Sequence, residues 1–96
     1  MKAILIIRDR LVFQYGAILE VKVWRVPASV PPASHSLKYS LFYGRPGERI
    51  VGYDNERGKG DHRHYSDREE EYAFVSIEKL LADFRLDVEK VRRERI

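Results

Sequence analysis

Apolar and polar residues alternate along much of the first half of this chain, and no other feature limits the possible folds as strongly. In residues 2–14, KAILIIRDRLVFQ, apolar side chains recur at alternate positions, with basic residues among those between them. Residues 17–26, AILEVKVWRV, repeat the pattern after a Tyr-Gly turn. Successive side chains of a β-strand point to opposite faces, so a period of two predicts strands. These two segments are expected to pair as a hairpin.

A second hairpin is expected further along the chain. Residues 36–43, SLKYSLFY, return to the alternation, and GRPGE at 44–48 forms a turn before a returning strand at 49–54, RIVGYD. Residues 61–65, DHRHY, add a strand if they are extended. The acidic run at 68–71 is interpreted as a solvated lead-in to the next element, because it has no apolar alternation.

The C-terminal segment has a helical period instead. Ser76 is a good N-cap for a helix that begins at Ile77. Apolar residues then recur at helical spacing, at Ile77, Leu80, Leu81, Phe84, Val88 and Val91. The sequence predicts an α+β fold, an antiparallel sheet of four to five strands with one amphipathic C-terminal helix packed on a face. At this length we expect a single domain over residues 1–96.

Composition excludes several classes of site. The chain has no cysteine, which rules out disulfides, thiolate zinc sites and cysteine nucleophiles, and makes the cytoplasm the expected compartment. The apolar run before Arg8 is too short for a signal peptide or a membrane span, so we expect no membrane contact. No P-loop, Rossmann fingerprint or nucleophile elbow is present. The net charge is only +3, but Arg supplies 12 of the 18 basic residues, and an Arg-rich composition by itself favours nucleic acid only slightly.

One polar run, GYDNERGKGDHRHYSDREEEY at residues 52–72, has more donors and titratable groups than a hairpin loop needs. Gly58 and Gly60 let the backbone turn sharply and present side chains close to a ligand. If the following residues are extended, His62 and His64 share one face of a strand and can act on one site.

Two histidines beside cationic side chains are what a metal-independent ribonuclease needs. One imidazole takes the proton of the 2′-hydroxyl, the other protonates the leaving oxygen, and Lys or Arg stabilises the phosphate charge. Imidazoles titrate near neutral pH, so both protonation states are available. The candidate catalytic residues are Tyr53, Asp54, Lys59, His62 and His64, and the candidate substrate-binding residues are Asn55, Arg57 and Arg63. No metal or other cofactor is expected.

Three other interpretations stay open. The two histidines, with Asp54 or Asp61, offer ligands for a metal ion. They also fit a solvated strand edge beside a wide turn, with no chemical role. A non-enzymatic protein would instead bind nucleic acid or a partner through a basic sheet surface, for which the candidate contacts are Arg8, Arg10, Arg25 and Arg63. His35 lies in a Pro/Ser-rich connection and is expected to be inert.

The order VWRVP, KYSLFYGRPGERIVGYDNERGKGDHRHY and then FVSIEKLLADF resembles the TumE family of small bacterial and archaeal toxins, over about residues 3–92. The resemblance implies a toxin of a type II toxin-antitoxin system, encoded beside an antitoxin with a helix-turn-helix DNA-binding domain that neutralises it by direct binding. The polar motif of the family maps onto Tyr53, Asp54, Asn55, His62 and His64, with Lys59 in the intervening loop. The ERGKGD segment departs from the His- and Pro-rich loop of many relatives, which leaves the acid-base assignment open.

The motif and the resemblance together predict a growth-inhibiting toxin with RNA as its target. His62 and His64 would act as base and acid, Lys59 and Arg57 would stabilise phosphate charge, and Asp54 or Asn55 would orient an imidazole or the substrate. The expected partner is the helix-turn-helix antitoxin, and a homodimer is left open.

Overall fold

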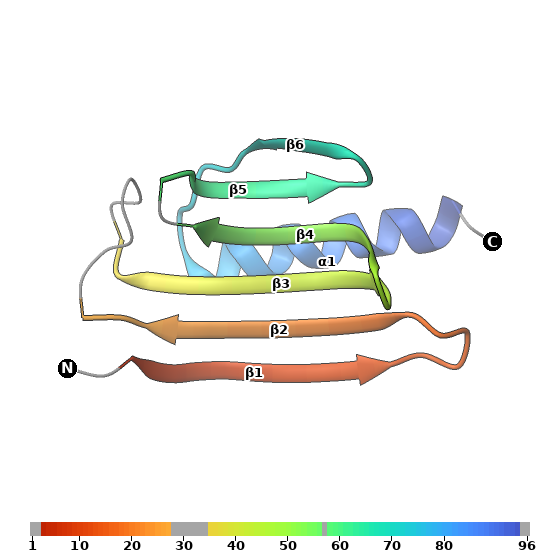
Figure 1. Ribbon diagram of the computed structural model, residues 1–96, viewed down its shortest axis with the longest axis horizontal. Coiled ribbons are helices and arrows are strands. Elements are labelled where there is room, and N and C mark those ends of the chain that lie inside the picture. The colour runs from red at the N-terminus through yellow and green to blue at the C-terminus, as the bar shows by residue number, and fades with distance from the viewer. Residues whose placement is uncertain (1–2, 28–34, 57, 95–96) are drawn as a thin grey trace.

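The computed structural model describes residues 3–27, 35–56 and 58–94, and within them six strands form one antiparallel sheet. The elements are β1 (Ile4–Val12), β2 (Ile18–Arg25), β3 (Leu37–Arg45), β4 (Glu48–Glu56), β5 (Gly60–Tyr65), β6 (Arg68–Glu71) and α1 (Ile77–Glu94). Each strand lies beside its neighbours in the chain, so the sheet order is β1-β2-β3-β4-β5-β6 (Figure 1). The α+β class, both hairpins and the helix start are confirmed.

The expected number of strands is wrong, because the acidic run at 68–71 is a strand rather than a lead-in. Ser66 adopts a left-handed backbone with a φ of 61°, which folds the chain back onto β5. An ion pair between Arg63 and Glu70 joins the two strands. All four residues of β6 are exposed, so this edge strand has no buried face and no apolar alternation to reveal it.

Helix α1 covers one face of the sheet and leaves the other face, called here the open face, without a helix (Figure 1). Its first turn is capped as expected, since the Ser76 Oγ accepts the Lys79 N–H at 3.1 Å. The core between helix and sheet consists mainly of Val23, Tyr39, Leu41, Val51, Tyr53, Leu80, Phe84, Val88 and Val91. No helix of the described residues is long and apolar enough to span a bilayer.

Two tyrosine hydroxyls attach the helix to the sheet. Tyr53 of β4 donates to Asp87 Oδ2 at 2.5 Å, and Tyr72 donates to Asp83 Oδ2 at 2.6 Å. The Tyr53 ring also meets Phe84 edge-to-face, with 6.0 Å between centroids. These directional bonds, added to the apolar contacts, fix where along the sheet the helix lies.

Asn55 extends the pairing of β3 and β4 with its side chain. The backbone register of the two strands runs only as far as Ser40 opposite Asp54. Beyond it the Asn55 side chain accepts the Tyr39 N–H at 2.9 Å and donates to the Leu37 carbonyl at 2.7 Å. The Asn55 side chain is fully buried, and its two bonds satisfy a buried backbone N–H at Tyr39 and a partly buried carbonyl at Leu37.

Replacing Asn55 with Ala is expected to lower the free energy of unfolding by about 2 to 4 kcal/mol, because it leaves one buried and one partly buried backbone group without their partners. Urea denaturation of the purified protein measures the loss. Asn55→Asp keeps the acceptor for Tyr39 but places a buried carboxylate oxygen against the Leu37 carbonyl, so it should cost at least as much as the alanine. A near-neutral alanine variant would show that the amide does not support the strand end.

A carboxylate and two imidazoles on the open face

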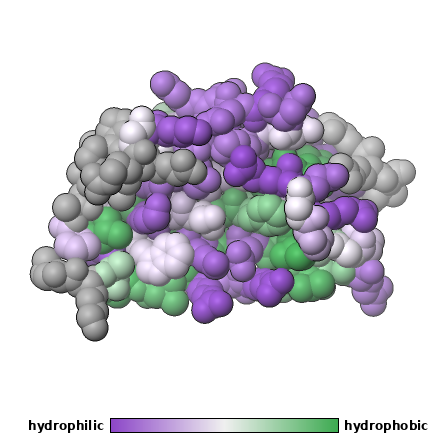
Figure 2. Space-filling model, viewed as in Figure 1, coloured by the Kyte–Doolittle hydropathy of each residue, from purple (hydrophilic) through white to green (hydrophobic). Residues whose placement is uncertain are grey.

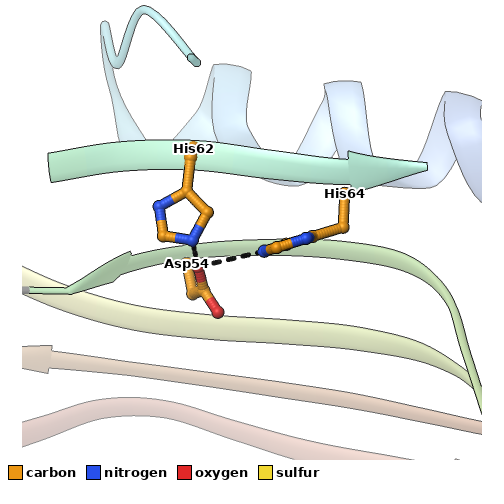
Figure 3. A group of neighbouring side chains, drawn as sticks. All are labelled: Asp54, His62 and His64. Carbon is orange, nitrogen blue, oxygen red and sulfur yellow. Dashed lines mark ion pairs between the residues drawn. The ribbon is translucent and has the colours of Figure 1, made fainter. Parts of the chain in front are cut away.

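The candidate site lies on the open face because neighbouring residues of a strand point to opposite sides. Tyr53 points to the helix, so Asp54 points away from it. In the β4–β5 register Asp54 lies opposite His62, and Gly52 lies opposite His64. Residues directly opposite each other share a face, which brings both histidines to the side of Asp54 (Figure 3).

The three side chains converge on one place. His62 Nε2 lies 2.5 Å from Asp54 Oδ1, and His64 Nε2 lies 3.8 Å from the same oxygen. The two imidazole rings meet edge-on, with 4.9 Å between centroids. Both histidines are buried, at 4% and 8% exposure, so the charges of the group are shielded from water.

Both ring nitrogens of His62 face oxygens. Nδ1 lies 3.0 Å from the Gly60 carbonyl, which can only accept, so Nδ1 carries a hydrogen. Nε2 then faces the Asp54 carboxylate at 2.5 Å, where two lone pairs would repel. Among the described residues neither His62 Nε2 nor Asp54 Oδ1 has an aligned hydrogen-bond partner. The contact therefore requires a proton or another cation between the two atoms.

His64, unlike His62, contacts a cation at its Nδ1 atom. A guanidinium has only donors, so Arg49 Nη2, at 2.9 Å, donates to Nδ1 of His64 and leaves the ring hydrogen on Nε2. Burial lowers the pKa of His64, and the positive charge of Arg49 lowers that pKa further. His64 is therefore neutral at neutral pH, whereas both ring nitrogens of His62 face oxygens.

Exposed charged side chains lie beside the buried group. Glu69 Oε1 is 3.7 Å from His62 Nε2, and Lys59 Nζ is 3.6 Å from the same glutamate oxygen. The Arg49 side chain reaches His64 by passing over Gly52, where the glycine leaves room. A Cβ at Gly52 would lie 2.6 Å from Arg49 Cδ. The site therefore combines buried acid-base groups with cations that solvent and an anionic ligand can reach.

The same atoms can hold a metal ion. One ligand atom each from Asp54, His62 and His64 lies within 4.8 Å of the others, and this mixed nitrogen and oxygen set suits zinc or a similar transition metal. The bond from His62 Nδ1 to the Gly60 carbonyl is the kind that orients a metal-binding imidazole. Asp61, the other acid considered from the sequence, accepts bonds from Tyr39 and contacts His35 instead.

The family model for Toxin TumE matches residues 2–92. The chain belongs to the TumE toxin family. No curated protein and no solved structure matches it. Membership gives the chain a toxin role and implies an antitoxin partner.

The structure brings Asp54, Lys59, His62 and His64 of this TumE-family chain together, and it separates the other candidates from them. Tyr53 is fully buried on the helix face, where burial and the bond to Asp87 raise its pKa and keep the hydroxyl protonated. Three further candidates remain, in different places. Arg63 contacts Tyr53, Asp87 and Glu70 on the helix face, Asn55 bonds the β3 backbone, and Arg57 lies outside the described residues.

The basic residues of the binding-protein alternative do not form one surface. Arg8 belongs to a row of directly opposed residues that includes Lys22 and ends at His62, so it lies on the open face. Arg63 lies opposite Tyr53 and therefore on the helix face. A ligand bound flat on one side of the sheet would meet only part of this set.

Two residues of the site were missed from the sequence. Arg49 was read only as the start of a strand and Glu69 as part of a solvated run, yet both contact the histidines. The glycine three residues after Arg49 is the available signal, because Gly52 creates the space for it. His35, expected to be inert, lies 2.6 Å from Asp61 and packs on Phe74 with 4.1 Å between ring centroids, which anchors the start of β3.

NMR titration should give His64 a pKa below its ordinary value of 6.5, and Arg49→Met should raise that pKa, because it removes a facing positive charge. Arg85→Met, a charge removal on the helix, is the control and should leave it unchanged. Because folding lowers the pKa of His64, the unfolded chain binds a proton first as pH falls below 6.5. The free energy of unfolding should therefore drop below this pH, and it should drop less in Arg49→Met. An unchanged His64 pKa in Arg49→Met would contradict the contact.

Proposed function

We propose that this TumE-family toxin arrests growth by cleaving RNA, without a metal, at the group formed by Asp54, His62 and His64. The observation that carries the proposal is the difference between the two imidazoles. His64 faces a cation and is neutral, whereas both nitrogens of His62 face oxygens, so one ring can accept a proton while the other can donate one. We further propose that an antitoxin with a helix-turn-helix domain neutralises the toxin by direct binding.

His64 is the proposed base. A phosphate of the substrate draws the Arg49 guanidinium away from the imidazole, because a charged oxygen is a better acceptor than a neutral ring nitrogen. The freed Nδ1 of His64 then takes the proton of the ribose 2′-hydroxyl. The resulting oxygen attacks the neighbouring phosphorus and forms a new P–O bond.

His62 is the proposed acid. As the bond from phosphorus to the 5′-oxygen breaks, the proton held between His62 Nε2 and Asp54 passes to that leaving oxygen. Arg49 and Lys59 stabilise the additional negative charge on the phosphate. The products of this route are a 2′,3′-cyclic phosphate and a 5′-hydroxyl end, and no water enters the first step.

The test compares wild type with His62→Gln and His64→Gln in two assays. In cells, an inducible promoter drives equal soluble expression while growth and RNA ends are followed. In vitro, purified protein acts on end-labelled RNA and on the same sequence as DNA. Each substitution should lower the cleavage rate by about 100-fold or more, because it removes a proton-transfer group. His35→Gln, on the other face of the sheet, is the control and should retain activity.

The chemical groups at the ends of the RNA fragments report most directly on the reaction. Cyclic phosphates with 5′-hydroxyls, together with no cleavage of DNA, are the expected result, because the route needs a 2′-hydroxyl. Growth arrest with intact transcripts would contradict RNA cleavage. Arrest by both glutamine variants would place the active groups elsewhere.

A metal-dependent nuclease is the second candidate, and the convergence of His62 Nε2 and Asp54 Oδ1 without an aligned hydrogen bond favours it. A bound zinc ion would supply an activated water and a Lewis acid for phosphate hydrolysis. The chain would contribute three ligands, and Arg49 and Lys59 would position the phosphate. Protein treated with a chelator would then lose activity and regain it with added zinc, and fragments would end without a cyclic phosphate.

A further inference from the structure

Strand β1 forms an edge of the sheet, and its side chains are unusually apolar for an exposed edge. Ile4, Leu5, Ile6, Leu11 and Val12 are each between 40% and 68% exposed. Figure 2 shows apolar surface at both ends of the lower edge, where β1 runs in Figure 1, with hydrophilic surface between them. An edge strand is a template for pairing with another strand, and exposed apolar side chains at both ends of the strand favour such pairing.

The backbone of β1 presents hydrogen-bonding groups at regular intervals on its outer side. The Phe13 N–H donates to the Ala17 carbonyl at 2.8 Å, which makes these residues a hydrogen-bonded pair of the β1–β2 hairpin. Hydrogen-bonded and non-bonded pairs alternate along antiparallel strands, so the N–H and C=O groups of Arg8, Arg10 and Val12 point away from β2.

One of these outward groups is already bonded, which agrees with the alternation. The Arg10 N–H donates to the side chain of Asp9 at 2.9 Å, as it can only if it points out of the ladder. At the other end a register irregularity between Leu5 and Ile7 interrupts regular pairing. The regular stretch open to a new strand is therefore Ile7–Val12.

A groove lies beside this stretch on the helix side. Figure 1 shows α1 behind the central strands and away from β1. The space between β1 and the helix, about 340 Å³, is lined mainly by apolar side chains such as Ile7, Leu11 and Leu81, together with the charged residues Asp9, Arg85, Glu89 and Arg92. A strand added outside β1 would bring every second side chain to the rim of this groove.

A second copy of this chain does not fit the edge. A two-fold antiparallel pair centred on Asp9 places Asp9 opposite Asp9 and Arg8 opposite Arg10. A pair centred on Arg8 or on Arg10 places that arginine opposite itself. Like charges directly opposite each other destabilise a sheet, so the registers that pair the whole stretch repel.

The positive charges of Arg8 and Arg10 favour an acidic partner strand. Arg8 lies opposite Lys22 on β2, and Arg10 lies opposite Glu20, which forms its ion pair with Lys22 on its own strand. In the described part of the chain neither Arg8 nor Arg10 forms an ion pair. Carboxylates on a neighbouring strand would lie directly across from both guanidinium groups.

We propose that the antitoxin adds a β-strand to the outer edge of β1 along Ile7–Val12, with acidic side chains opposite Arg8 and Arg10 and apolar side chains on the side of the groove. This proposal rests on the proposed neutralisation by direct binding. Main-chain hydrogen bonds supply affinity in such strand addition, and alternate side chains supply specificity. The edge lies three strands from β4, so it is an attachment surface distinct from the Asp54 group.

Hydrogen exchange of the toxin, alone and with the purified antitoxin encoded beside it, tests the surface. Binding should slow exchange of the outward amides of Arg8 and Val12, which have no partner in the ladder. Protection confined to other strands, such as the opposite edge β6, would overturn the proposal. A free toxin that is dimeric and already protected at these amides would assign the edge to a second copy and overturn it too.

The matched variants Arg8→Pro and Arg8→Ala separate the backbone from the charge. Proline removes an outward N–H without touching the ladder, which edge strands tolerate. We expect it to weaken antitoxin binding about tenfold beyond the effect of alanine. Equal affinity of both variants would refute strand addition. If the proline variant does not fold, Arg8→Glu with Arg10→Glu replaces it and should weaken binding strongly, whereas wild-type affinity would refute the proposal.

Growth arrest by the toxin without antitoxin distinguishes a failure of the proposed function from a failure of the proposed β1 surface. Arg8→Pro should still arrest growth and should resist rescue by the antitoxin. If wild type arrests no growth, the proposed function fails, while protection at Arg8 and Val12 still reports on the surface. If wild type arrests growth and the antitoxin binds without protecting β1, only the surface is wrong.

Discussion

The register between β4 and β5 is the constraint on which both faces of this molecule depend. Tyr53 points to the helix and bonds Asp87, so the next residue, Asp54, must point to the open face, where the register places it against His62. A slip of one residue would turn the carboxylate toward α1 and the tyrosine toward solvent. The apolar core that the helix covers on one side therefore holds the polar group together on the other.

The carboxylates on the two faces of the sheet differ in their hydrogen bonds. On the helix face the hydroxyls of Tyr53 and Tyr72 form aligned bonds with carboxylates of α1, which stabilise the packing of the helix, whereas the buried Tyr65 hydroxyl has no partner among the described residues. On the open face His62 and Asp54 approach within 2.5 Å without an aligned bond, beside a neutral His64. Buried polar atoms without aligned partners are rare in folded proteins and concentrate at functional sites. On the open face the unpaired atoms belong to two ionisable groups in contact with each other, and this is the physical reason for locating the chemistry there.

Alternation and capping were enough to predict the hairpins, the helix start at Ile77 and a polar group around His62 and His64. They were not enough for β6, because its residues are all exposed and carry no pattern. Sequence proximity also grouped Tyr53 with Asp54, although adjacent strand residues lie on opposite faces. Arg49 reaches the site only because its side chain passes over Gly52. The groove beside β1 can be recognised only once the position of α1 is known.

The most direct test of the central claim is growth arrest by Asp54→Asn beside Asp83→Asn, at equal soluble expression and with thermal unfolding measured for both. Each substitution removes one carboxylate and keeps its shape, one from the open face and one from the helix face. Asp54 orients His62 in the acid-base route and is a ligand in the metal route, so its loss should abolish arrest in either case. Asp83→Asn should still arrest growth. Arrest by Asp54→Asn at the wild-type level would contradict the assignment of the toxic site to the open face.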